Sequence, residues 1–193
     1  MTGPDVVVGA DGLPRCFWAT STADYLAYHD DEWGRPVHGE RELYERFTLE
    51  AFQSGLSWLT ILRKREAFRR AFAGFDPQAV AGFGPAQRAA LLADAGIVRN
   101  GAKIDAAIAN ARAVLDLREH GGLDALVWAH APARHAPPAR RTDLPATSPE
   151  SVALARALKG SGFRFVGPTT AYAAMQACGL VDDHLAGCHR ALG

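Results

Sequence analysis

Residues 28–34 read YHDDEWG and residues 48–58 read TLEAFQSGLSW, so aromatic side chains, a histidine and one unusual carboxylate crowd into two neighbouring stretches. The apolar pattern predicts a helix over residues 40–53, because at about 100° per residue its large side chains fall within one arc of about 100°. Glu50 lies about 20° outside that arc. A carboxylate at the edge of a buried face must reach water or be held by hydrogen bonds, since burying an unpaired charge costs several kcal/mol or shifts its pKa.

Two explanations fit Glu50. An ion pair at the edge of the helix, for example with Arg46, is the commoner fate of a lone glutamate. Trp58, eight residues later, and the aromatic residues within 28–34 favour a pocket instead. Indole rings offer stacking faces, and a carboxylate accepts hydrogen bonds from amino or ring N–H groups while favouring positive charge. The pattern therefore indicates a site for a purine, and best of all for a cationic purine.

Four short motifs carry a resemblance to a known family. They are Cys16-Phe17-Trp18, residues 27–34 (AYHDDEWG), Leu49-Glu50 and residues 54–58 (SGLSW). With these motifs the chain resembles the bacterial 3-methyladenine DNA glycosylases of type I, from about Arg15 to Cys188. The resemblance implies an all-α fold like that of the helix-hairpin-helix DNA glycosylases. It also implies a base-excision repair enzyme that flips 3-methyladenine out of alkylated double-stranded DNA, hydrolyses its N-glycosidic bond and releases free 3-methyladenine.

The resemblance also assigns roles to individual side chains of the pocket. Trp58 is expected to stack on the flipped base, and Tyr28 and Glu50 to read its edge, with Glu50 as the catalytic residue. Trp18 and Trp33 are expected in the pocket wall, although packing in the core is an equal alternative. Methylation at N3 leaves the base cationic, so the base departs as a neutral leaving group. Little acid catalysis is then needed, and specific recognition becomes the harder task.

The stretch of residues 160–170, GSGFRFVGPTT, predicts a glycine-rich turn that leads into a helix beginning at Pro168. Free backbone N–H groups at such a helix start suit a phosphate, although a plain helix corner explains the pattern at least as well. The resemblance identifies this turn as the hairpin of the DNA-binding element and implies DNA contacts at Gly167, Thr169 and Thr170. In relatives that also cleave the backbone a lysine takes the place of Thr169, so a monofunctional glycosylase without lyase activity is expected.

Two further side chains are candidates for a direct role. Leu56, in the loop before Trp58, is a candidate wedge for the position that the flipped base vacates, as apolar side chains fill opened base steps elsewhere. Asp182 lies in a segment where many members of the wider superfamily carry a catalytic carboxylate. A capping aspartate in a turn is the commoner explanation of Asp182, and we give Glu50 more weight.

Two cysteines and two histidines at the ends of the chain match positions at which the family binds zinc. They are Cys16, His29, His184 and Cys188. Their spacing alone is merely suggestive, but the resemblance implies one structural zinc ion per chain, because two Cys and two His complete a tetrahedral site. The ion would staple the N-terminal segment to the C-terminal one. His189 is a less well placed alternative ligand, and Cys178 is expected to be a core thiol.

Composition sets broader limits. Of 193 residues, 48% are hydrophobic and 22% charged, and the formal net charge is zero, so DNA contacts must rest on a local patch. No apolar run has the length of a membrane span, and the start lacks the features of a secretory signal, so we expect a cytoplasmic protein, as a monomer and without a membrane partner. We predict a flexible tail over residues 1–14 and one helical domain over residues 15–193.

The remaining punctuation predicts helices over residues 57–73, 86–93, 101–120, 149–159 and 168–179, and an irregular connection over residues 131–146. The arginines and the lysine of residues 63–70 are expected to form a solvated helix face. Two other functions stay open at this point. A non-catalytic, zinc-stapled nucleic-acid-binding protein would not need Glu50 beside Trp58, and a purine-binding protein or small-molecule hydrolase would not need the phosphate-binding hairpin.

Overall fold

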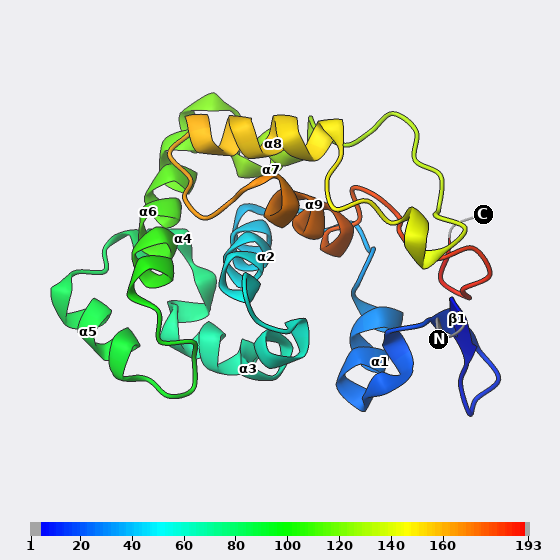
Figure 1. Cartoon of the computed structure of the whole chain (residues 1–193). Helices are drawn as coiled ribbons and strands as arrows, with labels where there is room; N and C mark the ends of the chain where they lie inside the picture. Colours follow the sequence, from blue (N-terminus) through cyan, green and yellow to red (C-terminus); the bar gives the residue numbers. More distant parts are fainter. Residues whose placement is uncertain (1–4, 192–193) are drawn as a thin grey trace.

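The computed structural model describes residues 5–191, and its fold is mainly helical (Figure 1). The α-helices are α1 (Ala23–Asp31), α2 (Glu40–Gln53), α3 (Trp58–Ala71), α4 (Pro77–Ala81), α5 (Pro85–Ala93), α6 (Gly101–Leu117), α7 (Gly122–Trp128), α8 (Pro149–Gly160) and α9 (Pro168–Ala177). Short 3-10 helices occupy Ala19–Ser21, Ala73–Phe75, Arg118–His120 and Arg141–Asp143. No helix among residues 5–191 is both long and apolar enough to cross a membrane.

Helix α2 lies at the centre of the fold and packs against α3, α6, α7 and α9 (Figure 1). Its bounds agree with the prediction for residues 40–53. Leu43, Tyr44, Phe47 and Phe52 are almost completely buried, and the Tyr44 hydroxyl donates a hydrogen bond to the Ala107 carbonyl at 2.9 Å. Because the helix is covered on several sides, residues at the edge of its apolar face are also buried.

The C-terminal end of α2 is held by a lysine. Lys103 of α6 is 8% exposed, and its ammonium group donates hydrogen bonds to the carbonyls of Phe52 at 2.9 Å and Ser54 at 2.6 Å. Burial lowers the pKa of Lys103. Carbonyls at the end of a helix have no partner within the helix, so this lysine satisfies them and fixes the loop between α2 and α3.

Helices α8 and α9 pack together, and the chain reverses direction between them (Figure 1). Positive φ angles at Gly162 (93°) and Phe165 (57°) shape the turn. Asn110 of α6 clasps the turn, since its side chain accepts a hydrogen bond from Arg164 N at 2.7 Å and donates one to Arg164 O at 3.1 Å. The two predicted helices and the turn between them are present, and Asn110 anchors the turn to α6.

Two features differ from the sequence-based expectation. Strand β1 (Val6–Val8) pairs antiparallel with β2 (Pro14–Cys16), so the fold is not purely helical and the pairing crosses the predicted boundary at residue 15. Residues 1–4 lie outside the described residues. Helix α7 is absent from the prediction, because it begins directly after the predicted helix of residues 101–120, at Gly121-Gly122, and a glycine pair more often ends a helix. Both glycines adopt positive φ.

The N-terminal hairpin is fixed to the C-terminal segment. Arg15 is 2% exposed and pairs with Asp11 at 2.6 Å and with Asp30 of α1 at 2.7 Å. His189 N donates a hydrogen bond to Pro14 O at 2.7 Å. The N-terminal hairpin and the segment around His189 therefore lie side by side (Figure 1).

Candidate active site

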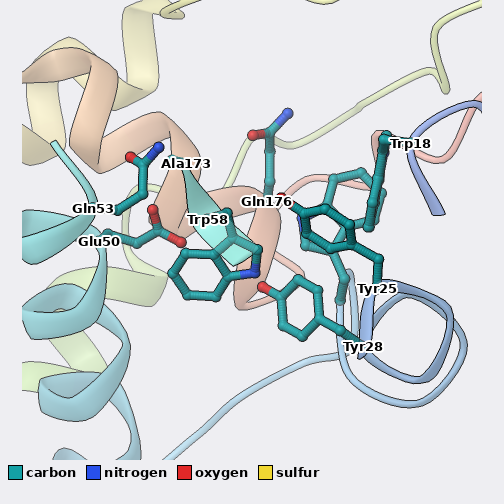
Figure 2. A pocket seen from close by; sticks show the side chains of 9 residues that line it. Trp18, Tyr25, Tyr28, Glu50, Gln53, Trp58, Ala173 and Gln176 are labelled. Carbon is teal, nitrogen blue, oxygen red and sulfur yellow. The ribbon is translucent and has the colours of Figure 1, made fainter. Parts of the chain in front are cut away.

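A cavity of about 280 Å³ lies where α1, α2, α3 and α9 converge, and we call it the aromatic cavity (Figure 2). Its lining residues are Trp18, Tyr25, Tyr28, Trp33, Glu50, Gln53, Trp58, Ala173 and Gln176. All five predicted base-binding residues are among them, although they come from four separate segments. The size and the flat aromatic walls suit a single planar base.

Glu50 is buried in this cavity with 7% of its surface exposed. No hydrogen bond or ion pair joins its side chain to another residue of the described chain. The alternative of an edge ion pair with Arg46 is therefore wrong, and Arg46 instead binds Glu32 with an Nη2–Oε2 distance of 3.0 Å. Burial raises the pKa of Glu50 to about 8, against the opposing charge of Arg46. The aromatic cavity thus holds a carboxylate whose negative charge the surrounding residues compensate poorly.

Tyr28 and Trp58 contribute further polar groups to the wall of the aromatic cavity. Tyr28 is 3% exposed, and burial, followed by the charge of Glu50, raises the pKa of its phenol well above the usual value. The indole Nε1 of Trp58 is buried without a hydrogen-bond partner among residues 5–191. Buried polar groups are nearly always hydrogen-bonded in native proteins, so a donor and acceptor set of this kind points to a bound ligand. Figure 2 shows the Tyr28 hydroxyl next to the indole nitrogen of Trp58, with the Glu50 carboxylate on the other side of the indole.

Trp18 and Trp33 connect the aromatic cavity to the histidines. Trp18 packs edge-on against Trp33, with ring centroids 5.2 Å apart, and Trp33 packs edge-on against His184 at 4.7 Å. Both tryptophans line the cavity and also pack against neighbouring rings.

Four lining residues were missed by the sequence analysis. Tyr25 lies three residues before Tyr28 on α1, a spacing that places both on one helix face and could have revealed it. Gln53 lies three residues after Glu50 on α2, so the same rule applies. Ala173 and Gln176 come from α9, far along the chain, and no local signal distinguishes them from other helix residues.

The predicted DNA-contacting residues lie on exposed segments near the aromatic cavity. Leu56 is 40% exposed, and its carbonyl accepts a hydrogen bond from Gln53 of the cavity wall at 3.0 Å. Gly167 and Thr169 are exposed and Thr170 is half-buried. They form the start of α9, one turn before Ala173 of the cavity wall.

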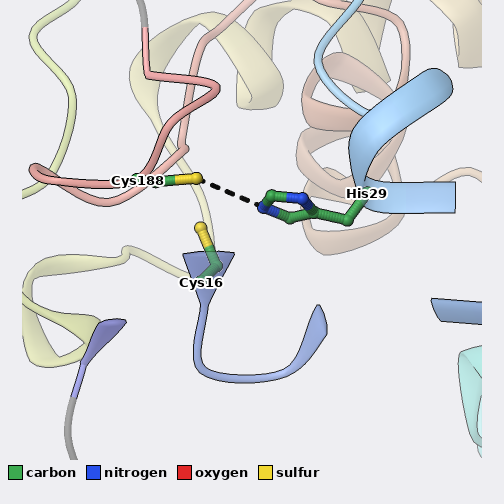
Figure 3. A group of neighbouring side chains, drawn as sticks. All are labelled: Cys16, His29 and Cys188. Carbon is green, nitrogen blue, oxygen red and sulfur yellow. Dashed lines mark hydrogen bonds between the residues drawn. The ribbon is translucent and has the colours of Figure 1, made fainter. Parts of the chain in front are cut away.

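Three of the four predicted zinc ligands form one buried cluster, Cys16, His29 and Cys188, whose ligand atoms all lie within 4.8 Å of one another (Figure 3). His29 Nε2 lies 3.4 Å from Cys188 Sγ. A hydrogen bond from Cys16 lowers the pKa of Cys188 well below its usual value, while it raises the pKa of Cys16. The cluster thus favours one thiolate, which is the form that binds metals.

His184, the fourth predicted ligand, lies beside the cluster. Its ring centroid is 4.9 Å from that of His29, and its Nε2 is buried without a hydrogen-bond partner among residues 5–191. Nδ1 of His184 lies 2.6 Å from Asp182, and Nδ1 of His29 lies 2.7 Å from Asp30. A carboxylate on Nδ1 of each ring leaves Nε2 free to bind a metal.

Asp182 and the minor candidates have other partners. Asp182 accepts a hydrogen bond from His184 N at 3.1 Å in addition to its contact with the ring, and it is not among the cavity-lining residues. His189 Nε2 contacts Asp30 at 3.1 Å. Cys178 is fully buried outside the cluster, and burial raises its pKa to about 12, as expected of a core thiol.

The basic face of α3 is largely used within the protein. Arg65 binds Glu32 at 2.6 Å, Arg69 binds Glu45 at 2.8 Å, and Arg63 binds Asp24 at 2.8 Å. Lys64 donates to the carbonyls of residues 95 and 96. These partners agree with the interpretation of a surface face rather than a cation patch reserved for DNA.

Comparison with known proteins gives a consistent result. The methyladenine glycosylase family model matches residues 18–191. The chain is 43% identical over 182 residues to DNA-3-methyladenine glycosylase 1 of Escherichia coli, covering 91% of this chain and 96% of that protein. It is 41% identical over 178 residues to DNA-3-methyladenine glycosylase of Haemophilus influenzae, covering 90% of this chain and 96% of that protein.

Solved structures agree with the sequence matches. A crystal structure of 3-methyladenine DNA glycosylase I superposes with a TM-score of 0.88 at 43% identity, covering 92% of this chain and 100% of the other. The Staphylococcus aureus enzyme, solved to explain its recognition of 3-methyladenine, superposes with a TM-score of 0.87 at 31% identity, covering 93% of this chain and 97% of the other. The chain therefore belongs to the methyladenine glycosylase family.

Proposed function

We propose that this protein excises 3-methyladenine from alkylated double-stranded DNA by hydrolysis of the N-glycosidic bond, as its named relatives indicate. The observation that carries the proposal is the buried, unpaired Glu50 beside Trp58 and Tyr28 in a cavity of about 280 Å³. A base of purine size fits this space, and the base must leave the duplex to enter it.

The charge of the damaged base explains the role of Glu50. With no ligand bound, the raised pKa of Glu50, about 8, favours the protonated form at neutral pH. A cationic base beside the carboxyl group stabilises the ionised form, and the ion pair forms away from water. A neutral base gains no such stabilisation. Glu50 therefore favours the methylated base over normal purines, while Trp58 supplies a stacking face and Tyr28 a hydrogen-bonding hydroxyl.

The reaction itself needs little help from the protein. The bond between C1′ and the base nitrogen breaks, and its electron pair moves into the ring and neutralises the positive charge. A water oxygen then bonds to C1′ and loses a proton. The ionised Glu50 stabilises the positive charge that builds up on the sugar as the bond breaks. We assign Glu50 as the catalytic residue on this basis.

The DNA contacts are proposed from the hairpin and the α2–α3 loop. The exposed start of α9 offers free backbone N–H groups at Gly167 and Thr169 to a phosphate, with Thr170 in the same turn. We propose that the exposed Leu56 fills the vacated base position, and the hydrogen bond of Lys103 to Ser54 in its loop supports this role. Thr169 stands where bifunctional relatives carry lysine, so no Schiff base forms and the enzyme is monofunctional.

We also propose a structural zinc ion held by the four predicted ligands. The fit rests on the donor set, because Cys16, His29 and Cys188 are clustered and the buried Nε2 of His184 lacks any other partner. Four protein ligands would leave no open position, so the metal supplies stability and no reaction chemistry. The role of Asp182 in this scheme is to orient His184. A monomeric state and a cytoplasmic location remain expectations from the sequence.

Release of bases from methylated DNA tests the proposed function. The protein is incubated with duplex DNA treated with a methylating agent, and released bases are separated by chromatography. We expect 3-methyladenine to be released and the DNA strands to stay intact until alkali is added. A folded protein that binds this DNA without releasing the base would be a non-catalytic binder and would overturn the proposal.

A further inference from the structure

Gln176 is the only amide of α9 that lines the aromatic cavity, and its orientation is fixed by a buried carboxylate. Its Nε2 donates a hydrogen bond to Asp183 Oδ2 at 2.7 Å. Asp183 is 2% exposed and also accepts a hydrogen bond from the Tyr172 hydroxyl at 2.7 Å, while its other oxygen lies 2.8 Å from His135 Nε2.

This network determines which way the amide faces. The Tyr172 hydroxyl and Gln176 Nε2 both donate to one oxygen, Asp183 Oδ2, so this oxygen acts as the acceptor for both groups. Gln176 must therefore turn Nε2 towards Asp183 and present Oε1 on the opposite side. Oε1 accepts no hydrogen bond from residues 5–191, and it is not a buried orphan. It remains available as an acceptor at the cavity wall.

The Oε1 acceptor of Gln176 bears on which purine the aromatic cavity binds. Adenine carries an amino group at C6, which donates hydrogen bonds, whereas guanine carries a carbonyl oxygen there, which accepts them. Two acceptors that face each other in a buried site leave both unsatisfied. We infer that Gln176, held by Asp183, is a specificity-determining residue whose Oε1 accepts a hydrogen bond from the 6-amino group and so favours 3-methyladenine over 3-methylguanine.

This inference rests on the proposed function but concerns a different residue and a different observable. Glu50 recognises the positive charge of the base and Trp58 stacks on its planar ring, and both methylated purines share these two features. Gln176 distinguishes the two purines from each other. Asp183 acts through Gln176 and is a positioning residue, while its neighbour Asp182 serves the histidine cluster.

The test compares the two bases directly. Binding of free 3-methyladenine and free 3-methylguanine is measured by titration calorimetry with the whole protein and with Gln176→Met, which keeps the length of the side chain but loses the acceptor. We expect affinity for 3-methyladenine to fall about three- to tenfold, the worth of one neutral hydrogen bond, with affinity for 3-methylguanine unchanged or higher. Gln78→Met, on the exposed face of α4, is the matched control and should leave both affinities unchanged.

A second variant tests the positioning by Asp183. Asp183→Asn can place its amide N–H₂ at the position of Oδ2, where it donates to the Tyr172 hydroxyl oxygen and to Gln176 Oε1, while its carbonyl oxygen still accepts from His135. The Gln176 amide then turns over and presents a donor. The preference between the bases should then shrink or reverse, with thermal unfolding followed to confirm folding. An equal loss for both bases in Gln176→Met, or an unchanged ratio in both variants, would overturn the inference. If the unaltered protein neither binds nor releases 3-methyladenine, the proposed function itself fails.

Discussion

Tyr28 and Trp58 pack against each other in the wall of the aromatic cavity, with ring centroids 5.3 Å apart and ring planes at 46°. Tyr28 is almost completely buried on α1, and Trp58 begins α3, so two helices that are far apart in the sequence hold the indole at one tilt. A stacking surface that is fixed before the base arrives avoids part of the ordering cost of binding.

Replacement of Trp58 tests this stacking surface. Trp58→Ala should weaken binding of free 3-methyladenine by about 1–3 kcal/mol, the usual worth of one base stacked on an aromatic ring. Trp58→Phe should lose less, because a smaller ring remains. Calorimetry with the free base measures both. Trp128→Phe is the matched control, since Trp128 packs on His38 away from the cavity, and equal affinities of Trp58→Ala and the unaltered protein would make Trp58 a core residue.

The pKa of Glu50 makes a separate prediction about stability. The pKa is raised from about 4.5 to about 8 on folding, so between these pH values the unfolded chain loses a proton that the folded protein keeps. The free energy of unfolding therefore falls as pH rises from about 4.5 to about 8, and the loss is complete above that window. The new glutamine side chain of Glu50→Gln does not titrate, so this variant avoids the loss of stability. Each unit of pKa shift corresponds to about 1.4 kcal/mol, so at pH 9 the variant should be more stable than the unaltered protein by a few kcal/mol.

Urea denaturation of both proteins from pH 4 to pH 9 measures this difference. At pH 4 the two should be nearly equally stable, because Glu50 is then protonated in both states. Glu119→Gln, at an exposed position, is the control and should show no pH-dependent gain. Curves for Glu50→Gln and the unaltered protein that run parallel across the range would mean that Glu50 is ionised without cost.

Zinc content tests the proposed staple between the chain ends. Cys16→Ser and His184→Ala should lose the ion and unfold at lower temperature, because a metal that binds only the folded protein stabilises it. Cys178→Ala removes a buried thiol outside the cluster and should retain zinc. This control separates the loss of zinc from the loss of stability that follows the removal of any buried side chain. Elemental analysis of the purified proteins gives the answer. Full zinc occupancy in His184→Ala would show that His184 is not a zinc ligand and would make His189 the next candidate.

Lys103 makes a prediction about the loop that carries Leu56. Lys103→Met leaves the carbonyls of Phe52 and Ser54 without their donor, which should cost about 1–3 kcal/mol of stability. Lys64→Met is the matched control, because Lys64 also donates to two carbonyls but is less buried, so water can replace it. Amide hydrogen exchange should accelerate around residues 53–58 in Lys103→Met alone. Slow exchange there would show that the loop is held by other contacts.

The sequence predicted the main helices because their signals are local. The apolar arc of residues 40–53 ends at Ser54-Gly55, and α8 and α9 each begin at a proline. Strand β1 was missed because its partner strand begins with Pro14 and the pair is only three residues long. A short pairing of this kind gives no periodic signal.

The site was predicted only where chemistry is unusual at a single position. Glu50 and Trp58 stood out, but the arc on α2 could not show that neighbouring helices bury most of Glu50. Gln176 gave no signal, since its role depends on a hydrogen bond to Asp183 that only the fold creates. The adjacent residues Asp182 and Asp183 give the same signal in the sequence. Only the fold shows that the Asp183 side chain contacts Gln176 while the Asp182 side chain contacts His184.

The most direct test of the account is the rate at which Glu50→Gln excises 3-methyladenine in a single turnover. Glutamine keeps the size but loses the charge, and a charge-assisted hydrogen bond contributes about 1.5–3 kcal/mol. We predict a rate lower by about one to two orders of magnitude, with residual activity because the methylated base is already activated. Asp182→Asn, which alters a partner of His184 outside the aromatic cavity, should lose less. Excision at the full rate by Glu50→Gln, together with an inactive but zinc-loaded Asp182→Asn, would contradict the account and make Asp182 the catalytic group.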